Sequence, residues 1–200
     1  MTVIMQAVVS VDGFIGYEDD MPGHLFDWYS NGDVEVLGGA GRISKASWDY
    51  VRDFWETSTT MVIGRHLFDI TNGWEGKPPT GDHVVVVSHR PKPEGWHPDA
   101  SYHFETSVEA GIAKAKELAG GTPIGLCAGE VAGQALAAGL VDEIQLDVAP
   151  LLIGRGKPFF GTYASSVLLS DPEVVQGDRV THLRYRVEGP ADPGHTAWKA

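Results

Sequence analysis

The sequence predicts a single α/β domain built on a mixed, mostly parallel sheet with antiparallel strands near its C-terminal end. Short continuous apolar runs alternate with helix-like segments through the middle of the chain, a pattern typical of parallel strands buried on both faces. Towards the end of the chain, apolar residues alternate with polar ones, as they do in half-exposed antiparallel strands. The 200 residues, 42% of them hydrophobic, are enough for one substantial core.

The N-terminal quarter predicts a strand, a long loop and a helix. The strand covers residues 3–9 and ends at the turn signal Asp12-Gly13. The segment 17–43 is rich in glycine and aromatic residues, shows no clear period, and is longer than the connections of compact domains usually are. Ser47 is the expected N-cap of a helix that continues to about residue 55.

Four further strands are predicted in the middle of the chain, at residues 60–63, 83–87, 102–104 and 124–127. A helix is expected to begin near Leu67 after the first of them. A second helix has Thr106 and Glu109 as a capping box and ends at Gly120-Gly121. A third follows residue 129 and ends at Gly139. Helices between strands indicate parallel connections.

The last part of the chain predicts two strands of period two, around residues 144–148 and 183–187. We therefore expect one domain over residues 1–188. The remaining residues, 189–200, are expected to form an irregular tail.

Composition excludes several function classes. The formal net charge of −12 leaves no basic face to release counterions, so nucleic acid is not an expected partner. Because no apolar run approaches the roughly 18 residues needed to span a bilayer, no membrane partner is expected. The eight histidines show no H-E-x-x-H spacing, so no metal site is expected. With Cys127 as the single cysteine and no signal-peptide pattern, a reducing cytoplasm is the expected compartment.

Glycine and basic residues follow three of the predicted strands. Ligands of open α/β sheets bind beyond the carboxyl ends of the strands, and glycine next to a helix start lets backbone N–H groups approach an anion. These loops predict a ligand with several phosphates, although tight turns and solvated arginines would give the same pattern. Neither G-x-G-x-x-G nor a P-loop is present. The candidate residues are Gly64, Arg65, His66, Ser88, His89, Arg90, Ala128, Gly129, Glu130, Val131 and Ala132.

The segment 128–160, AGEVAGQALAAGLVDEIQLDVAPLLIGRGKPFF, resembles the dihydrofolate-reductase-like superfamily. Within that superfamily it is most similar to the reductase domain of bifunctional riboflavin-biosynthesis deaminase-reductases. Three other motifs agree in order, and with the first they cover most of residues 3–187. They are Ser10-Val11-Asp12-Gly13-Phe14-Ile15, Ile63-Gly64-Arg65 and Val87-Ser88-His89.

The resemblance implies the dihydrofolate-reductase fold, NADPH as hydride donor, commonly a homodimer, and 5-amino-6-(5-phosphoribosylamino)uracil as substrate. It implies that Gly64 and Arg65 face the adenosine side of the cofactor and that residues 88–90 lie near its 2′-phosphate. Residues 129–132 would contact the pyrophosphate. On the nicotinamide and substrate side it places Ser10, Asp12 and Ile15.

Two candidates carry alternatives. Asp12 is either a turn-forming residue or a group that hydrogen-bonds to, or protonates, a polarised C=N or C=O bond after hydride arrives. Trp28 belongs to a set of aromatic residues that either stack a flat heterocyclic substrate or form core. The other members of that set are Phe26, Tyr29, Trp48 and Trp55.

The chain departs from the family pattern in three places. Ala128-Gly129 stands where Gly-Gly is usual, and no deaminase motif H-x-E with P-C-x-x-C is present. A D-[DN]-P-x-L-x-x-R-like segment is replaced by residues 66–69, HLFD, and residues 73–76, GWEG. These features are more like stand-alone reductase-like members. Two alternative functions are a dihydrofolate or other pteridine reductase, and an NADP-binding protein without turnover.

Overall fold

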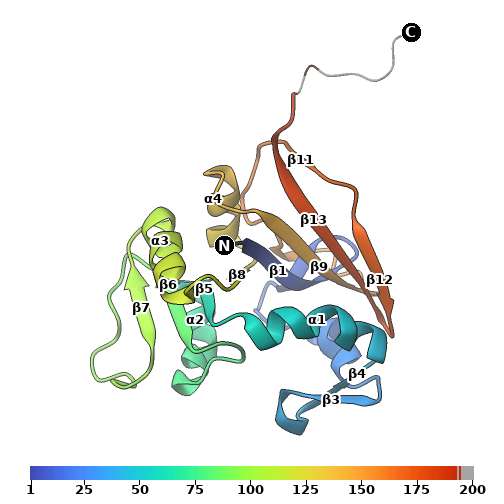
Figure 1. Ribbon diagram of the computed structural model, residues 1–200, viewed down its shortest axis with the longest axis horizontal. Coiled ribbons are helices and arrows are strands. Elements are labelled where there is room, and N and C mark those ends of the chain that lie inside the picture. Colours follow the sequence, from blue (N-terminus) through green and yellow to red (C-terminus); the bar gives the residue numbers. More distant parts are fainter. Residues whose placement is uncertain (193, 195–200) are drawn as a thin grey trace.

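In the computed structural model, which describes residues 1–192 and 194, one large sheet runs through the molecule (Figure 1). Among these residues the sheet has nine strands, in the order β11-β13-β9-β1-β8-β5-β6-β7, with β12 paired to β13 outside that row. Neighbouring strands from β9 to β7 are parallel. Strand β13 is antiparallel to β9, β11 and β12. The predicted fold class is therefore confirmed.

The strands differ in length, and β13 is the longest at 11 residues. Two small antiparallel pairs, β2 with β10 and β3 with β4, lie outside the main sheet. The bounds are β1 (Val3–Ser10), β2 (Phe14–Tyr17), β3 (Val34–Val36), β4 (Gly41–Ile43), β5 (Thr60–Gly64), β6 (His83–Val87), β7 (Tyr102–Glu105), β8 (Ile124–Cys127), β9 (Glu143–Ala149), β10 (Gly156–Pro158), β11 (Val167–Leu169), β12 (Glu173–Gly177) and β13 (Val180–Pro190).

Helices cover both faces of the sheet (Figure 1). Helices α3 (Val108–Ala119) and α4 (Glu130–Ala137) pack on one face, and α1 (Lys45–Thr57) and α2 (Arg65–Thr71) pack on the other. Three short 3₁₀ helices complete the described elements: η1 (Gly23–Tyr29), η2 (Leu37–Gly39) and η3 (Asn72–Gly76). Within the described residues, none of the helices combines the length and the apolar character that crossing a bilayer requires.

The core follows from the period of two along each strand. In β5, Val62 packs into the cluster beneath α3 and α4, whereas Met61 and Ile63 pack with Phe68 of α2. Val62 and Ile63 are 0% exposed, which explains why the sequence of this strand is continuously apolar. Each buried side chain of this size contributes roughly 1.5–3 kcal/mol relative to an exposed one.

Three predicted helix starts were wrong by one to three residues. Helix α1 is capped by Ser44, whose hydroxyl accepts a hydrogen bond from the Ser47 amide at 3.2 Å, and Ser47 itself lies buried in the first turn. Helix α3 is capped by Ser107, not by Thr106. In both places two hydroxyl residues compete for one cap, and spacing alone did not separate them. Helix α2 begins at Arg65, two residues before the predicted start.

The segment 17–43 is ordered rather than a simple loop. It holds η1 and the β3–β4 hairpin, and its Leu25 and Trp28 are buried against Val8 of β1 and Val51 of α1. Strand β9 corrects another expectation, because it pairs in parallel with β1 and antiparallel only with β13. Strand β13 continues to Pro190, so the predicted tail begins later than residue 189. Residues 193 and 195–200 of that tail lie outside the described residues.

Candidate functional site

The predicted ligand loops meet at one edge of the sheet, which we call the rim: the loops that follow Gly64, Val87 and Cys127. Strands β8, β5 and β6 are adjacent and parallel, so their carboxyl ends lie together. A Cβ atom added at Gly64 would lie 3.0 Å from Cγ2 of Val131. The Arg65 side chain reaches Ser88 Oγ at 3.4 Å. The first loop therefore touches both of the others, as the sequence predicted.

Gly129 forms the start of α4 at this rim. Its φ of +112° and ψ of −156° fall in a region that is essentially restricted to glycine. Its amide donates to the Phe159 carbonyl at 2.8 Å, and its carbonyl accepts from the Gly133 amide. Among the described residues, the N–H groups of residues 130–132 have no acceptor, as expected for a first helical turn. Such N–H groups can donate to an anion, so binding of a pyrophosphate here stays a prediction.

Glu130 brings a negative charge to the same helix start. Its carboxylate accepts hydrogen bonds from the Thr162 amide at 3.0 Å and from Gln134 Nε2 at 3.0 Å. These hydrogen bonds, that from Gln134 first, hold the pKa of Glu130 below its usual range. The carboxylate therefore binds the segment after β10. It accepts no hydrogen bond from the backbone N–H groups of the first helical turn.

Arg65 is committed to holding the rim together. Its Nε donates to Asp69 Oδ1 at 2.7 Å, and its Nη1 donates to the carbonyls of Arg90 and Pro91 at 3.3 and 3.1 Å. The guanidinium also lies over the Phe68 ring, 5.4 Å from its centroid. With only 16% of the side chain exposed, Arg65 positions residues 88–91 and is not a freely available cation.

Arg90 and His89 are exposed basic residues of the rim. The Arg90 side chain is 65% exposed, and one of its nitrogens donates to Asp69 Oδ2 at 2.6 Å. His89 is exposed. Ser88 is buried, accepts from the Arg90 amide at 2.9 Å and donates to the Arg90 carbonyl at 2.7 Å, which fixes the turn. The rim thus presents Arg90 as an exposed positive charge that is paired with Asp69.

His66 contacts a segment from elsewhere in the sequence. Its Nε2 lies 2.7 Å from Oδ1 of Asp20, and Lys157 Nζ lies 3.4 Å from the same oxygen. The hydrogen bond with His66 is the main cause of a pKa of Asp20 below its usual value. The loop after β2 is therefore attached to the start of α2. The sequence offered no signal for this pair, because the two residues are 46 positions apart.

Ile15 lies next to Gly129 at the rim, and Ser10 lies in the turn after β1. A Cβ atom at Gly129 would lie 3.7 Å from Cδ1 of Ile15. Ser10 ends β1, and its buried hydroxyl donates to Asp12 Oδ1 at 2.6 Å while it accepts from the Phe14 amide at 2.9 Å. Ser10 therefore shapes the turn after β1, and its hydroxyl acts there both as a donor and as an acceptor.

Asp12 joins two loops at the carboxyl ends of β1 and β9. Its carboxylate also accepts from the amides of Ile153 at 3.1 Å and Gly154 at 2.6 Å. The hydrogen bond from Ser10, followed by those two amides, lowers the pKa of Asp12 to about 2. The carboxylate is thus ionised at neutral pH and anchors the loop. Its predicted role as a proton donor stays a prediction, one that the low pKa disfavours.

Replacement of Asp12 by Asn should give a pH-dependent loss of stability. An unfolded Asp has a pKa of roughly 3.9, above the folded value of about 2, so its ionised form stabilises the folded chain above that unfolded value. The difference in free energy of unfolding between wild type and Asp12→Asn should have its maximum value at pH 6. It should shrink as pH falls from about 4 to 2. Urea unfolding at pH 6 and pH 3 measures it, with Asp53→Asn as the control. A difference that is the same at both pH values contradicts the assignment.

Trp28 is part of the core and not of the site. It is 1% exposed, packs edge-on against His182 at 5.4 Å between ring centroids, and contacts Tyr29 at 4.1 Å. A fully buried ring cannot stack on a ligand in this conformation. Of the two interpretations that the sequence allowed for Trp28, the core is correct.

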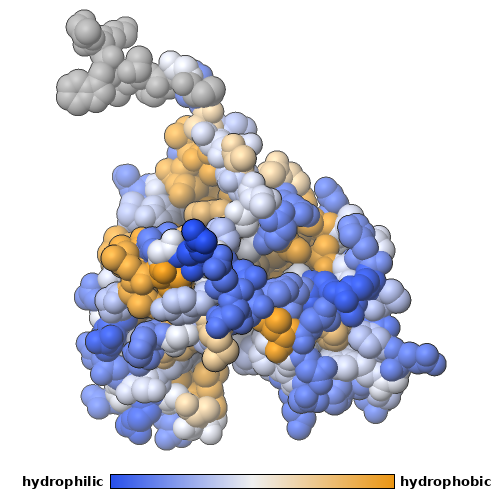
Figure 2. Space-filling model, turned by 180° about the vertical axis from the view of Figure 1, so that it is seen from behind, coloured by the Kyte–Doolittle hydropathy of each residue, from blue (hydrophilic) through white to orange (hydrophobic). Residues whose placement is uncertain are grey.

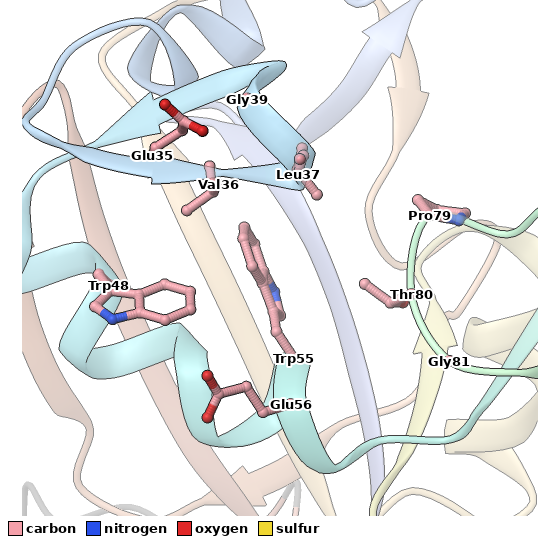
Figure 3. Close-up of a pocket in the computed structure, with 11 residues that line it drawn as sticks. Glu35, Val36, Leu37, Gly39, Trp48, Trp55, Glu56, Pro79, Thr80 and Gly81 are labelled. Carbon is pink, nitrogen blue, oxygen red and sulfur yellow. The ribbon is translucent and has the colours of Figure 1, made fainter.

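Trp48 and Trp55 instead line an open hollow of about 480 Å³. Figure 3 shows the Trp55 ring projecting from α1 towards the β3–β4 hairpin, with the Trp48 ring beside it and Thr80 across the space. Figure 2 shows the lower edge of the molecule notched between two lobes. Gly81 packs against the backbone of Thr59, just before β5, so the hollow lies at the amino end of that strand. The five residues of β5 separate it from the rim by roughly 13 Å.

The hollow is unsuited to phosphate because its charged lining residues are Glu35 and Glu56. Phosphate contacts in proteins come from Lys, Arg and backbone N–H groups, whereas carboxylates repel it. The hollow is therefore distinct from the rim in both position and charge.

A buried Ser–His–Asp arrangement ties α1 to the sheet. His182 Nδ1 lies 2.6 Å from Asp147 Oδ1, and its Nε2 lies 2.9 Å from Ser47 Oγ. Ser47 and His182 are both 0% exposed. A nucleophile must be reached by its substrate, so this arrangement is a structural hydrogen-bond network despite its resemblance to a catalytic triad.

The segment that replaces the expected substrate-phosphate motif forms a left-handed turn. Asn72, Trp74 and Glu75 all have φ between 47° and 53°, which costs about 1–2 kcal/mol for each residue that is not glycine. The turn is held by Tyr102, whose hydroxyl donates to the Gly73 carbonyl at 2.7 Å, and by Trp96 Nε1, which donates to Asn72 Oδ1 at 3.0 Å. With Glu75 in place of a basic residue, this turn offers no cation to a substrate phosphate.

Comparison with known proteins gives the family. The family described as RibD C-terminal domain matches residues 1–183. The chain belongs to the RibD C-terminal domain family. Membership of this family supports a pyrimidine or riboflavin-pathway reductase. A search of curated proteins found no match.

Solved structures show the same dihydrofolate-reductase-like fold. A protein from Shewanella sp. PV-4 named for riboflavin biosynthesis is 21% identical, with a TM-score of 0.72 over 94% of this chain and 99% of that one. A pyrimidine reductase-like protein from Corynebacterium diphtheriae is 15% identical, with a TM-score of 0.56 over 93% and 91% of the two chains.

A third solved structure is longer than this chain. It is the diaminohydroxyphosphoribosylaminopyrimidine deaminase/5-amino-6-(5-phosphoribosylamino)uracil reductase from Thermotoga maritima, which is 13% identical with a TM-score of 0.60. The match covers 93% of this chain and 56% of that protein. This RibD-family chain therefore shares its fold with a little over half of that longer protein.

The rim of this RibD-family chain fits a nicotinamide dinucleotide. The backbone at Gly129 has a conformation restricted to glycine, and a Cβ atom there would lie 3.7 Å from Cδ1 of Ile15. Unpaired N–H groups at that start suit a pyrophosphate, and Arg90 suits a further phosphate. Both groups lie on one edge of the sheet, at the ends of neighbouring strands.

Proposed function

We propose that this RibD-family protein is an NADPH-dependent reductase of a small heterocycle, with 5-amino-6-(5-phosphoribosylamino)uracil as the substrate that its family implies. The observation that carries the proposal is the joining of the three ligand loops at one rim. Gly64 packs against Val131, and Arg65 binds the turn at Ser88. NADPH, when bound, supplies the hydride, so no catalytic base need be present in the chain.

In this proposal the residues of the rim bind and orient. The N–H groups of residues 130–132 hold the pyrophosphate. Arg90, with His89 beside it, holds the 2′-phosphate, while Arg65 keeps the turn at residues 88–91 in place. Ile15 packs next to Gly129 and helps to exclude water from the nicotinamide side. Asp12 fixes the loops after β1 and β9, which border the substrate.

The turn that replaces the family's substrate-phosphate motif carries no basic residue. The left-handed turn at residues 72–76 carries Glu75 and not a basic residue. We therefore expect that a dephosphorylated form of the substrate competes well with the phosphorylated form. Steady-state kinetics with both forms measures this preference.

Two titrations test the function. Addition of NADPH should quench the fluorescence of the intrinsic tryptophans and saturate, and absence of saturable binding would end every NADPH reductase assignment. Loss of reduced-nicotinamide absorbance with a pyrimidine or with dihydrofolate then names the substrate class. Binding without turnover on any of these substrates would instead indicate an NADP-binding protein.

Arg90→Ala should weaken NADPH far more than NADH. An exposed guanidinium paired with a phosphate contributes about 1.5–3 kcal/mol, which corresponds to roughly 10- to 100-fold in Kd. NADH lacks the 2′-phosphate and should bind nearly as before. Fluorescence titration with both nucleotides measures the two ratios, and Arg52→Ala on α1 is the control for removal of one exposed arginine. Equal weakening of NADPH and NADH would remove the 2′-phosphate from this part of the rim.

A further inference from the structure

Asp69 connects the two arginines of the rim. One carboxylate oxygen accepts from Arg65 Nε at 2.7 Å, and the other accepts from Arg90 Nη2 at 2.6 Å. Desolvation opposes ionisation, but the hydrogen bonds from these arginines prevail and hold the pKa of Asp69 below its usual value. A negative charge therefore lies within the group of cations that the proposed function assigns to a phosphate.

The two arginines depend on Asp69 to different extents. Arg65 has further hydrogen bonds to the carbonyls of residues 90 and 91 and lies over two aromatic rings, Phe68 and Phe104. For Arg90, among the described residues, Asp69 is the only hydrogen-bond partner of its side chain. Asp69 is thus one of several groups that position Arg65, whereas it is the group that positions the Arg90 side chain and offsets its charge.

We propose that Asp69 is a specificity-determining residue that narrows the preference of the rim for NADPH over NADH. The inference rests on the proposed function, because it takes the rim as the nucleotide site. Asp69 halves the positive charge that the two arginines offer, from +2 to +1. A 2′-phosphate must share Arg90 with this carboxylate and is repelled by it. An unphosphorylated ribose hydroxyl can instead donate a hydrogen bond to the same carboxylate.

Replacement of Asp69 by Asn tests the proposal without any need for turnover. The amide keeps the size of the side chain and an oxygen acceptor but removes the charge. We expect the Kd of NADPH to fall about fivefold, as is typical when one unfavourable exposed charge is removed. The Kd of NADH should stay the same or rise. Adenosine 2′-monophosphate and adenosine, titrated by calorimetry, should show the same contrast without the nicotinamide half.

Two variants serve as controls. Asp53→Asn removes the same charge from an aspartate on α1 that pairs with Arg52, so it reports any general effect of net charge. Asp69→Glu keeps the charge and should retain the wild-type preference, and urea unfolding of each variant shows that the rim remains folded.

The affinities of these variants test the role of Asp69 separately from the proposed function. An unchanged ratio of NADPH to NADH affinity in Asp69→Asn, or weaker NADPH binding, overturns the role of Asp69 while leaving the proposed function intact. A wild-type protein that binds neither nucleotide overturns the proposed function and, with it, this inference. Tighter NADPH binding in Asp69→Asn together with unchanged binding in Asp53→Asn supports the assignment.

Discussion

Gly129→Ala should destabilise the protein and weaken NADPH binding together. The backbone at this position, with φ of +112° and ψ of −156°, is one that an L-residue adopts at a cost of about 1–3 kcal/mol. A new Cβ atom would meet only Cδ1 of Ile15 at 3.7 Å, an ordinary contact, so the effect comes from the backbone and not from a clash. Relief of that strain would rotate the first turn of α4 and misalign the amides of residues 130–132.

Denaturant unfolding and NADPH titration measure the two effects of Gly129→Ala. The matched control is Gly139→Ala, at the other end of the same helix, where φ is +68° and the space around the residue is open. That left-handed position costs an alanine about 1 kcal/mol and lies away from the rim. We expect NADPH affinity to fall about tenfold or more in Gly129→Ala, since about 1.4 kcal/mol gives a factor of ten, and to be kept in Gly139→Ala. Equal affinities in the two variants would separate Gly129 from nucleotide binding.

His182→Leu should lower the free energy of unfolding by about 3 kcal/mol. The leucine fills a similar volume, so the loss reports mainly the hydrogen bonds to Asp147 and Ser47. Both of those groups would lose the imidazole, and the fully buried Ser47 hydroxyl would keep only Ser44 Oγ, at 3.1 Å, as a partner. Loss of a hydrogen bond in a buried position is costly. Thermal and urea unfolding of the two proteins at neutral pH measure the difference.

His103→Leu is the control for that experiment. The ring of His103, on β7, has no hydrogen-bond partner among the described residues for its buried Nε2, so its replacement removes no such interaction. We expect a loss below about 1 kcal/mol there. If His182→Leu is no more destabilised than His103→Leu, the buried network contributes nothing to stability.

The parallel half of the fold could be predicted because its strands are buried on both faces. β5 and β6 each contain a short, β-branched run of apolar residues, which is typical of a strand buried on both faces. The segment 17–43 could not be predicted, since its hairpin strands have only three residues each and carry no measurable period. Its order comes from burial of Trp28 against distant strands, a tertiary effect that no local pattern records.

In the candidate site, too, some features could be predicted from the sequence and others could not. Glycine and arginine at strand ends located the rim, because the rule for parallel sheets depends only on the order of elements. The roles of the individual residues could not be assigned from the sequence. Arg65 holds a turn and Arg90 remains exposed, although both looked like phosphate ligands. Asp69 was overlooked because only the folded chain brings it between them.

The backbone ladder between β1, β8 and β5 has a mechanical consequence. These strands join the β9–β13 side of the sheet to the β6–β7 side through consecutive hydrogen-bonded pairs. A hinge between those two sides would have to break these pairs. Domain closure of the kind seen in two-domain enzymes is therefore expensive here. Accommodation of a ligand falls instead to short surface segments such as the one around Asp20, which is anchored to His66 by side chains alone. Backbone amides of β1, β8 and β5 should accordingly exchange their hydrogens slowly, whereas those of the segment around Asp20 should exchange fast.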